Sequence, residues 1–127
     1  MKYLTPQQVL AIHDQMIKRF GGSHGIRDIG LLESAVARPQ TTYGGKDLYP
    51  TVFLKTAALL HSLLRNHQFV DGNKRTAYTS AGIFLKLNGY KLTPLGKKSS
   101  DFMIKAENEK FELEEIADWL KKNSKKA

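Results

Sequence analysis

Apolar side chains recur three or four residues apart near the start of the chain, and this spacing predicts a first helix. The residues that share its apolar face are Val9, Ile12, Met16 and Phe20. Thr5 followed three residues later by Gln8 is the pattern of a capping box, so we expect the helix to begin at Pro6. Gly21-Gly22 is expected to end it.

A second helix is expected to begin after Asp28, whose carboxylate can cap it, and to stop at Pro39. Its apolar positions are Leu31, Leu32, Ala35 and Val36. Residues 40–50 then predict a loop with Gly44-Gly45 at its tip, because glycine pairs favour tight turns.

The two most apolar helices are predicted at residues 51–66 and 73–88. The first is apolar on most faces, which is typical of a buried, central helix. Beyond Gly89 the pattern weakens: residues 90–100 predict irregular chain or a short strand, and residues 101–108 and 112–122 predict two further helices. Strand signals are scarce, so the predicted class is all-α.

The length of 127 residues favours one domain, placed at residues 1–120, with a basic C-terminal tail at 121–127 that we expect to be frayed and solvated. The absence of cysteine excludes thiolate nucleophiles, iron–sulfur clusters and cysteine zinc sites. No stretch reaches the roughly 20 apolar residues that span a bilayer, and the N-terminus lacks the apolar core of a signal peptide. These features predict a cytoplasmic protein with no membrane partner.

The net charge of +8 indicates an anionic partner, which could be a nucleic acid, a nucleotide or an acidic protein. Residues 1–66 carry eight basic and four acidic side chains, and residues 67–127 carry twelve and eight, so each half is +4. Much of the charge of the second half lies in the terminal lysine run. This distribution weakens the nucleic-acid interpretation.

Residues 67–75, between the two most apolar helices, combine an imidazole, a carboxylate, an amide, an amine and a guanidinium. Polar groups close to the centre of a fold need partners, so we expect a cleft at this loop. Phe69, between polar neighbours, is expected to anchor the loop in the core. The first N–H groups of the helix that follows have no acceptor within it and, with the helix dipole, attract anions.

The side chains around this helix start favour phosphate chemistry. Gly72 leaves the backbone open to a phosphate, and Lys74 and Arg75 add positive charge. Asp71 is expected to hold Mg²⁺ together with water and phosphate. His67 is expected to take a proton from an attacking hydroxyl. The segment therefore predicts a phosphoryl or nucleotidyl transfer site, while the GxGxxG, Walker A and HExxH patterns are absent from the sequence.

Residues 66–77, NHQFVDGNKRTA, resemble the signature of the death-on-curing (Doc) toxins, a branch of the Fic superfamily. Further similar segments follow in the order of that family, and the resemblance covers about residues 3–92. It implies a compact bundle of about six helices, with the active-site loop at the N-terminus of a central helix. It also implies a cytoplasmic bacterial toxin of a toxin–antitoxin pair.

The resemblance to Doc-type proteins implies a kinase that uses ATP and Mg²⁺ to phosphorylate a threonine of elongation factor Tu. This phosphorylation would arrest translation. The resemblance further implies a Phd-like antitoxin whose disordered segment folds on binding. By position in the motif, the resemblance implies that His67 is the general base and that Asp71 is the metal ligand. Gly72 shapes the loop, and the positions that hold phosphates are Asn73, Lys74 and Arg75.

The wider Fic pattern differs at two positions. Lys74 stands where that pattern has glycine, and Tyr78 stands where it has a second arginine. Both differences favour the kinase over an AMP-transferase, which stays as the alternative. The inhibitory pattern of many Fic proteins, Ser or Thr four residues before Glu-Gly or Glu-Asn, is also missing, since Met103 precedes Glu107-Asn108.

A remote alternative is a non-enzymatic basic helical domain that binds nucleic acid. It predicts basic side chains along one helix face, whereas the cations of the motif accompany a base and a metal ligand.

Among the other histidines, His13 is expected to make a local hydrogen bond, His61 to be a paired core residue and His24 to be exposed. The loop at 40–50 is interpreted either as a flap that docks a target segment, as similar loops do in Fic proteins, or as a plain flexible loop.

Overall fold

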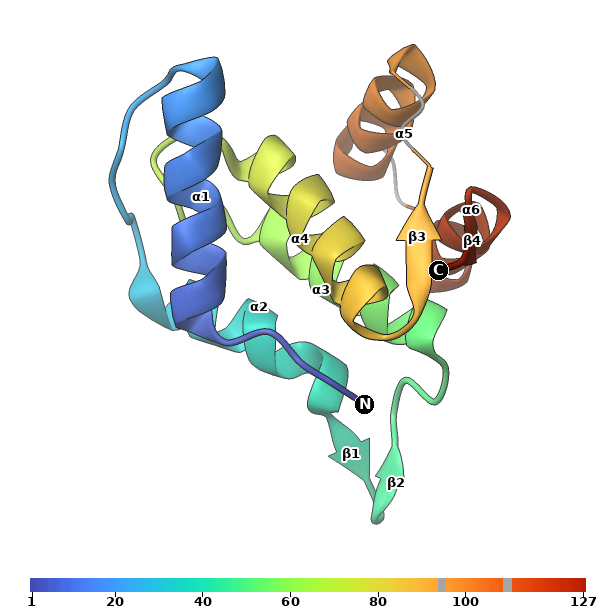
Figure 1. Ribbon diagram of the computed structural model, residues 1–127. Helices are drawn as coiled ribbons and strands as arrows, with labels where there is room; N and C mark the ends of the chain where they lie inside the picture. Colours follow the sequence, from blue (N-terminus) through green and yellow to red (C-terminus); the bar gives the residue numbers. More distant parts are fainter. Residues whose placement is uncertain (94–95, 109–110) are drawn as a thin grey trace.

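The computed structural model describes residues 1–93, 96–108 and 111–127, which form six α-helices and four short strands (Figure 1). The helices are α1 (Pro6–Phe20), α2 (Ile29–Ala37), α3 (Val52–Arg65), α4 (Asn73–Leu87), α5 (Lys97–Asn108) and α6 (Leu113–Lys122). The strands are β1 (Thr42–Tyr43), β2 (Lys46–Asp47), β3 (Tyr90–Leu92) and β4 (Ser124–Lys126), and a 3-10 turn at Arg38–Gln40 follows α2. The predicted all-α class is confirmed. No helix among these residues is long and apolar enough to cross a membrane.

Three helices begin at side chains that cap them. The Thr5 hydroxyl accepts a hydrogen bond from the Gln8 N–H, and the Gln8 side chain accepts one from the Thr5 N–H. Asp28 and Thr51 each accept from the backbone N–H three residues later, at the starts of α2 and α3. A cap of this kind is worth about 1 kcal/mol. The predicted starts of these helices are confirmed.

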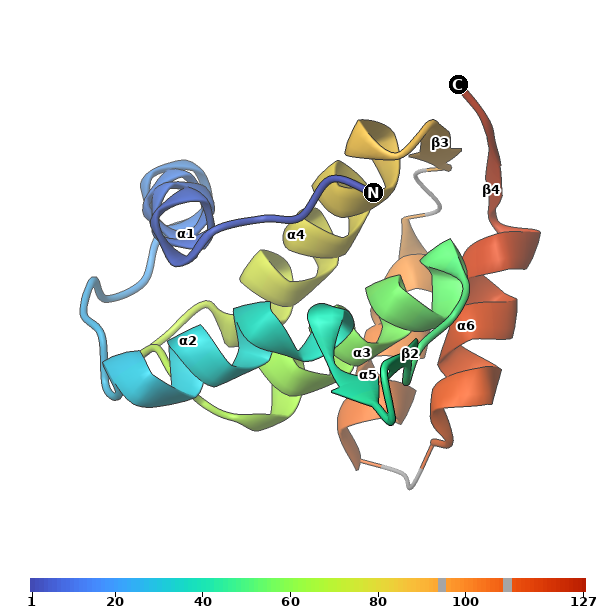
Figure 2. The ribbon, with the colours of Figure 1, turned by 90° about the horizontal axis from the view of Figure 1, so that it is seen from below.

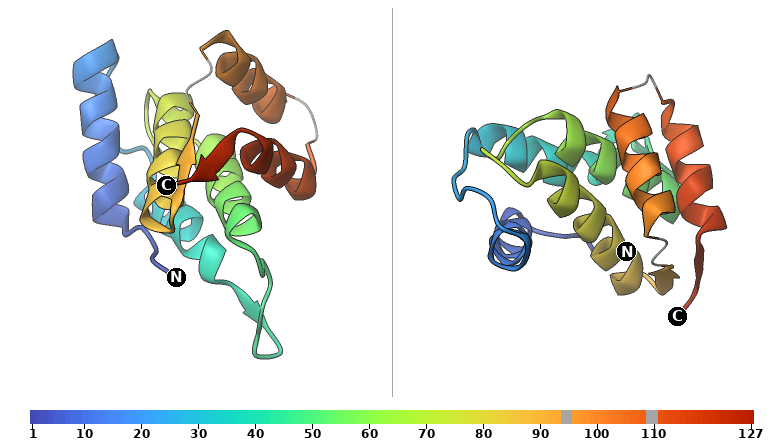
Figure 3. Two further views of the ribbon diagram at one scale, coloured as in Figure 1. Left: turned by 45° about the vertical axis from the view of Figure 1, so that its right-hand side comes forward. Right: turned by 90° about the horizontal axis from the view of Figure 1, so that it is seen from above.

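Helix α3 is the centre of the molecule, as predicted. Nine of its residues are buried, and it packs against α2, α4, α5 and α6. Figures 2 and 3 show α1 and α2 on one side of the α3–α4 pair and α5 and α6 on the other. The core includes Leu59, Leu60 and Leu63 of α3, Phe84 of α4 and Leu120 of α6. The loop that joins α3 to α4 therefore connects the two helices that contribute much of the core, and its Phe69 belongs to that core.

Residues 40–50 form the β1–β2 hairpin, with Gly44-Gly45 at its tip. The hairpin is tied to the core by Lys55, whose side chain is 2% exposed. The Lys55 ammonium donates to the Pro39 carbonyl at 3.0 Å and forms an ion pair with Asp47 at 3.3 Å. Figure 1 shows the hairpin at the end of the molecule opposite the α3–α4 loop. It does not flank the motif as a flap would.

Helix α5 begins at Lys97, four residues before the predicted start at Asp101. Its first turn is Lys-Lys-Ser-Ser, which carries no apolar residue, so the helical period is visible only from the buried Phe102 onward. The predicted irregular stretch at 90–100 contains the strand β3, and residues 94–95 of that stretch lie outside the described residues.

The expectation of a frayed C-terminus is wrong. Residues 121–122 complete α6, and β4 pairs antiparallel with β3, with Lys125 opposite Lys91. The pairing is extended by Ala127, whose N–H donates to the Gly89 carbonyl, and by the Thr93 N–H, which donates to the Asn123 carbonyl. A run of lysines has no strand periodicity, so only contact with a distant segment makes these residues a strand.

Removing residues 124–127 should therefore destabilise the fold. The truncation removes the β3–β4 pairing and the bond from the Ala127 N–H to the Gly89 carbonyl. Each backbone hydrogen bond contributes about 1 kcal/mol, so losing two or more of them should lower the free energy of unfolding by about 2 kcal/mol. Thermal and urea unfolding, followed by circular dichroism, measure this loss. The control is the double variant Lys125→Gln with Lys126→Gln, which keeps the strand and should be at least as stable as the wild type, because like charges directly opposite one another destabilise a sheet. Equal stability of the truncated and full-length chains would contradict the assignment.

Candidate active site

The loop between α3 and α4 is fixed by a segment that precedes α2. The Arg27 N–H donates to the Gln68 carbonyl at 2.7 Å, and the Val70 N–H donates to the Gly25 carbonyl at 3.1 Å. Ile26 and Phe69 form an antiparallel bridge. Residues 25–28 therefore support the motif, a role that nothing in their local sequence indicates.

Asn73, the first residue of α4, closes the loop onto itself. Its Oδ1 accepts from the Phe69 N–H at 3.2 Å and from the Gln68 side chain at 2.9 Å, and its Nδ2 donates to the Phe69 carbonyl at 2.9 Å. The amide of Asn73 is thus used within the loop. Any phosphate contact by this residue falls to its backbone N–H at the start of the helix.

Phe69 is the predicted anchor, and it is 1% exposed. Its ring stacks on the imidazole of His13 from α1, with centroids 3.8 Å apart and planes at 5°. His13 Nε2 lies 2.8 Å from the carbonyl oxygen of Asp71. The expectation that His13 makes a local hydrogen bond is wrong, because its partner lies 58 positions away in the chain. The sequence gives no local signal for it.

Asp71 projects an exposed carboxylate whose two oxygens are both held by backbone N–H groups. Oδ1 accepts from Gly72 at 2.8 Å, and Oδ2 accepts from Ser23 at 3.1 Å. A carboxylate oxygen has more than one lone pair, so both oxygens can still bind a cation. No group of three or more His, Cys, Asp or Glu that could hold a metal lies within residues 1–93, 96–108 and 111–127. A single exposed carboxylate is the kind of ligand that Mg²⁺ takes together with water and phosphate.

The predicted site residues other than Phe69 line one cleft of about 540 Å³: His67, Asp71, Gly72, Asn73, Lys74 and Arg75. The rest of its wall comes from α1, from Gly21, Gly22 and Val70, and from Glu107 of α5. His67 has φ of 50°, the one positive φ of a non-glycine residue in the described part of the chain. Such a conformation is costly and is often found at functional sites.

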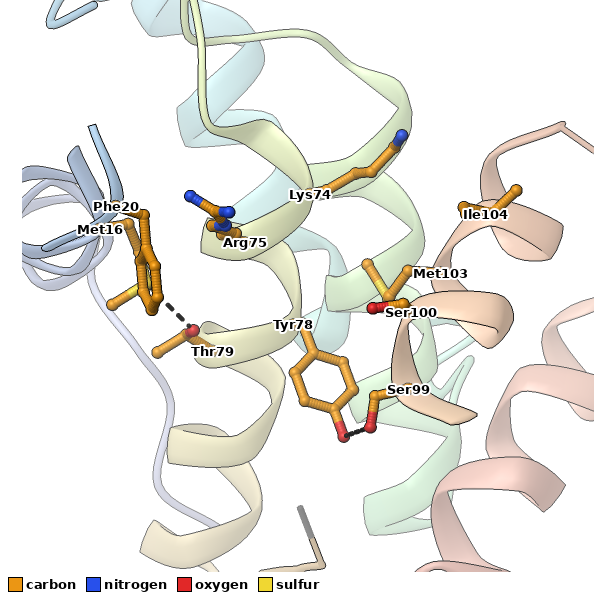
Figure 4. Close-up of a pocket in the computed structure, with 10 residues that line it drawn as sticks. All are labelled: Met16, Phe20, Lys74, Arg75, Tyr78, Thr79, Ser99, Ser100, Met103 and Ile104. Carbon is orange, nitrogen blue, oxygen red and sulfur yellow. Dashed lines mark hydrogen bonds between the residues drawn. The ribbon is translucent and has the colours of Figure 1, made fainter. Parts of the chain in front are cut away.

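The two cations of the motif have partners. Lys74 Nζ lies 3.0 Å from Glu107 Oε1, and the Arg75 guanidinium lies over the ring of Phe20, 4.3 Å from its centroid. Beyond them is a second pocket of about 360 Å³ (Figure 4). Its lining residues are Met16, Phe20, Lys74, Arg75, Tyr78, Thr79, Ser99, Ser100, Met103 and Ile104. A polar cleft and a more apolar pocket thus meet at Lys74 and Arg75.

The remaining histidines lie outside this cleft. His24 is exposed, as expected, and lies 3.5 Å from Asp14. His61 is paired, as expected, because the Arg38 guanidinium donates to its Nδ1 at 3.1 Å, but it is half-buried and does not lie in the core. Burial and the positive charge of Arg38 hold the pKa of His61 below its usual value. Of the four histidines, His67 is the one that lines the cleft.

Comparison with known proteins agrees with this geometry. Residues 3–85 match the model of the Fic/DOC family. The chain belongs to the Fic/Doc family. A protein named "Toxin Doc" from Mycolicibacterium smegmatis is 59% identical over 73 residues, which are 58% of this chain and 56% of that protein. A protein named "Protein kinase doc" from Escherichia phage P1 is 31% identical over 122 residues, 96% of this chain and 95% of that protein.

These matches place the chain in the Doc branch of the Fic/Doc superfamily and confirm the resemblance of the motif. The chain spans about half the length of the mycobacterial relative and nearly all of the phage relative. The six-helix bundle is consistent with the all-α Fic/Doc fold. The motif loop lies at the N-terminus of α4, as the resemblance implies.

Gly22 lets the backbone approach the carboxylate of Asp71, and an alanine there should disturb the site. A Cβ at Gly22 would lie 2.7 Å from Asp71 Oδ2, at a φ of 116°. Gly21 has a φ of 83° with nothing within 4 Å of its added Cβ. Both Gly22→Ala and Gly21→Ala carry the cost of a backbone conformation that L side chains rarely adopt, about 1–3 kcal/mol, but only Gly22→Ala should also displace Asp71.

Urea unfolding and the amide exchange of residues 22–23 and 71–72 measure the difference. We expect a larger loss of stability and faster exchange in Gly22→Ala than in Gly21→Ala. If the two variants behave alike, the contact between Gly22 and Asp71 has no energetic weight.

Proposed function

We propose that this protein is the toxin of a toxin–antitoxin pair and acts in the cytoplasm as an ATP- and Mg²⁺-dependent protein kinase. Its proposed substrate is a threonine of a translation factor similar to elongation factor Tu, whose phosphorylation arrests translation. The observation that carries the proposal is the single cleft that His67, Asp71, Lys74 and Arg75 line at the N-terminus of α4. The names of the two relatives support a toxin and a kinase.

The chemistry proposed for the cleft is in-line transfer of a phosphoryl group. The imidazole of His67 takes the proton of the attacking threonine hydroxyl, because imidazole accepts protons near neutral pH. The hydroxyl oxygen bonds to the terminal phosphorus of ATP as the bond to the bridging oxygen breaks, and ADP leaves. The first N–H groups of α4, with Lys74 and Arg75, hold the phosphoryl oxygens. Asp71 would hold Mg²⁺, and the bound ion would supply positive charge for the phosphate oxygens.

Two residues favour transfer of the terminal phosphate over transfer of AMP. Lys74 lines the cleft at the position where the wider Fic pattern has glycine. Its ammonium can exchange Glu107 for a phosphate, because the lysine side chain of the ion pair is 47% exposed. Tyr78 donates to or accepts from Ser99 at 3.1 Å in the adjoining pocket and brings no charge. This more apolar pocket suits a nucleoside, which would place the base away from His67 and the terminal phosphate toward it.

Induction of the chain in bacteria should add one phosphate group to a host protein, measured by intact mass. Label should transfer from ATP labelled in the terminal phosphate and not from ATP labelled in the inner phosphate. A mass gain of one AMP, or transfer of the inner label, would establish the AMP-transferase alternative. A salt-dependent shift of DNA by the purified chain, without any modified protein, would favour the nucleic-acid alternative.

His67→Ala should abolish growth arrest and leave the fold intact, since His67 is exposed in the cleft and no other histidine lines it. Removal of a general base typically costs about 100-fold or more in rate. The matched control is His24→Ala, at an exposed histidine outside the cleft. Full toxicity of His67→Ala at equal expression would remove this residue as the base.

The partner in this proposal is a Phd-like antitoxin with an acidic segment that folds on binding. A depression of about 340 Å³ lies on α4 and β3, and its lining residues are Tyr78, Thr79, Gly82, Ile83, Lys86, Lys91 and Leu92. Ile83 and Leu92 offer apolar contacts, and Lys86 and Lys91 place positive charge at the same depression. An amphipathic acidic segment complements both features. The net charge of +8 favours such a partner.

Co-expression with the small open reading frame beside the toxin gene should restore growth. The double variant Lys86→Glu with Lys91→Glu should weaken antitoxin binding about tenfold or more through like-charge repulsion. It should stay toxic, because neither residue lines the cleft that contains His67. Lys46→Glu, on the exposed hairpin, is the matched control. Normal rescue of the double variant would rule out this surface, and no rescue by any neighbouring gene would argue against inhibition in trans.

A further inference from the structure

His13 stands out among the buried polar residues because its ring stacking and its side-chain hydrogen bond both go to the motif loop. It lies on α1, its side chain is 4% exposed, and its ring covers Phe69. Its Nε2 points at the carbonyl oxygen of Asp71 at 2.8 Å. A carbonyl oxygen can only accept a hydrogen bond, so Nε2 carries the proton and donates it. The partner residues are the anchor of the loop and the proposed metal ligand.

The hydrogen bond from His13 fixes the orientation of a whole peptide unit. The carbonyl of Asp71 and the N–H of Gly72 belong to one planar group, so holding the oxygen also holds the N–H. That N–H donates to Oδ1 of the Asp71 side chain at 2.8 Å. Through this rigid plane, the imidazole of His13 sets the direction of the carboxylate without touching it.

The same peptide unit lies close to α1. Gly72 has φ of 78°, and a Cβ on it would lie 3.1 Å from Ile17 Cδ1 and 3.6 Å from the ring of His13. Gly72 is also the residue that immediately precedes α4. The orientation that His13 sets is therefore passed both to the carboxylate and to the first N–H groups of the helix.

We propose that His13 is a positioning residue for the transfer reaction, which aims the Asp71 carboxylate and the anion-binding end of α4 into the cleft. This inference rests on the proposed function for the reaction itself. Its structural basis is the linked set of contacts from His13 to the Asp71–Gly72 peptide and from that peptide to the carboxylate.

An imidazole is suited to this position because it does two things at once. Its flat face stacks on Phe69, and its edge donates to Asp71. Phenylalanine can keep the stacking but cannot donate, and glutamine can donate from its Nε2 but cannot stack. His13→Phe and His13→Gln therefore separate the positioning of Asp71 from the support of the fold.

In the kinase assay, we expect His13→Phe to lose kcat and to need more Mg²⁺ for half-maximal rate, each by about 10- to 100-fold, the range for groups that orient a metal ligand. Its KM for a peptide or protein substrate and its melting temperature should stay close to the wild type. His13→Gln should keep most of kcat and lose thermal stability instead. His24→Phe, at an exposed histidine, is the matched control and should match the wild type in all of these.

Amide exchange in the free protein gives a readout that does not depend on activity. The Gly72 N–H should exchange faster in His13→Phe than in His13→Gln or the wild type. Equal loss of kcat in the two variants would reduce His13 to structural support, and full activity of His13→Phe with unchanged exchange at Gly72 would remove it altogether; either result overturns the proposal. If the wild type transfers no phosphate, the proposed function fails, and the exchange comparison alone decides the role of His13.

Discussion

The hydrogen bonds of the Asn73 side chain hold the α3–α4 loop in one shape, and the rest of the site depends on that shape. Phe69 of the loop lies in the core, so the polar backbone beside it has to be satisfied close to apolar packing. A single amide does this by accepting from and donating to the backbone of Phe69. With the loop closed in this way, His67 and Asp71 reach the cleft from one side while Phe69 enters the core.

The loop is also braced by two segments from the first quarter of the chain. Residues 25–28 bond to its backbone, and α1 brings the imidazole of His13 under Phe69. The wall of the cleft comes from the same helix, through Met16, Ile17 and Phe20. Because one rigid helix carries both the brace and the wall, the width of the cleft and the direction of the loop are set together.

The ammonium group of Lys74 is held more loosely than the loop that precedes it. Lys74 is 47% exposed in its ion pair with Glu107, and exposed pairs contribute about 1 kcal/mol or less. Phosphate oxygens can therefore replace Glu107 at little cost. A fixed loop beside a lysine that can change its partner suits a site that binds and releases charged ligands. In the proposed function, the phosphate that is transferred would depend on how the nucleotide lies between this cleft and the adjoining pocket.

The sequence by itself determined the features that arise within one helical turn or one motif. Thr5, Asp28 and Thr51 cap helices through bonds to residues three positions away, and the residues from His67 to Arg75 are neighbours along the chain. Only the tertiary structure decided that β4 is a strand, that Gly22 faces Asp71 and that His13 supports the loop. These contacts join segments dozens of residues apart. Their partners are chosen by the packing of α1, α3 and α4, which no local pattern of residues records.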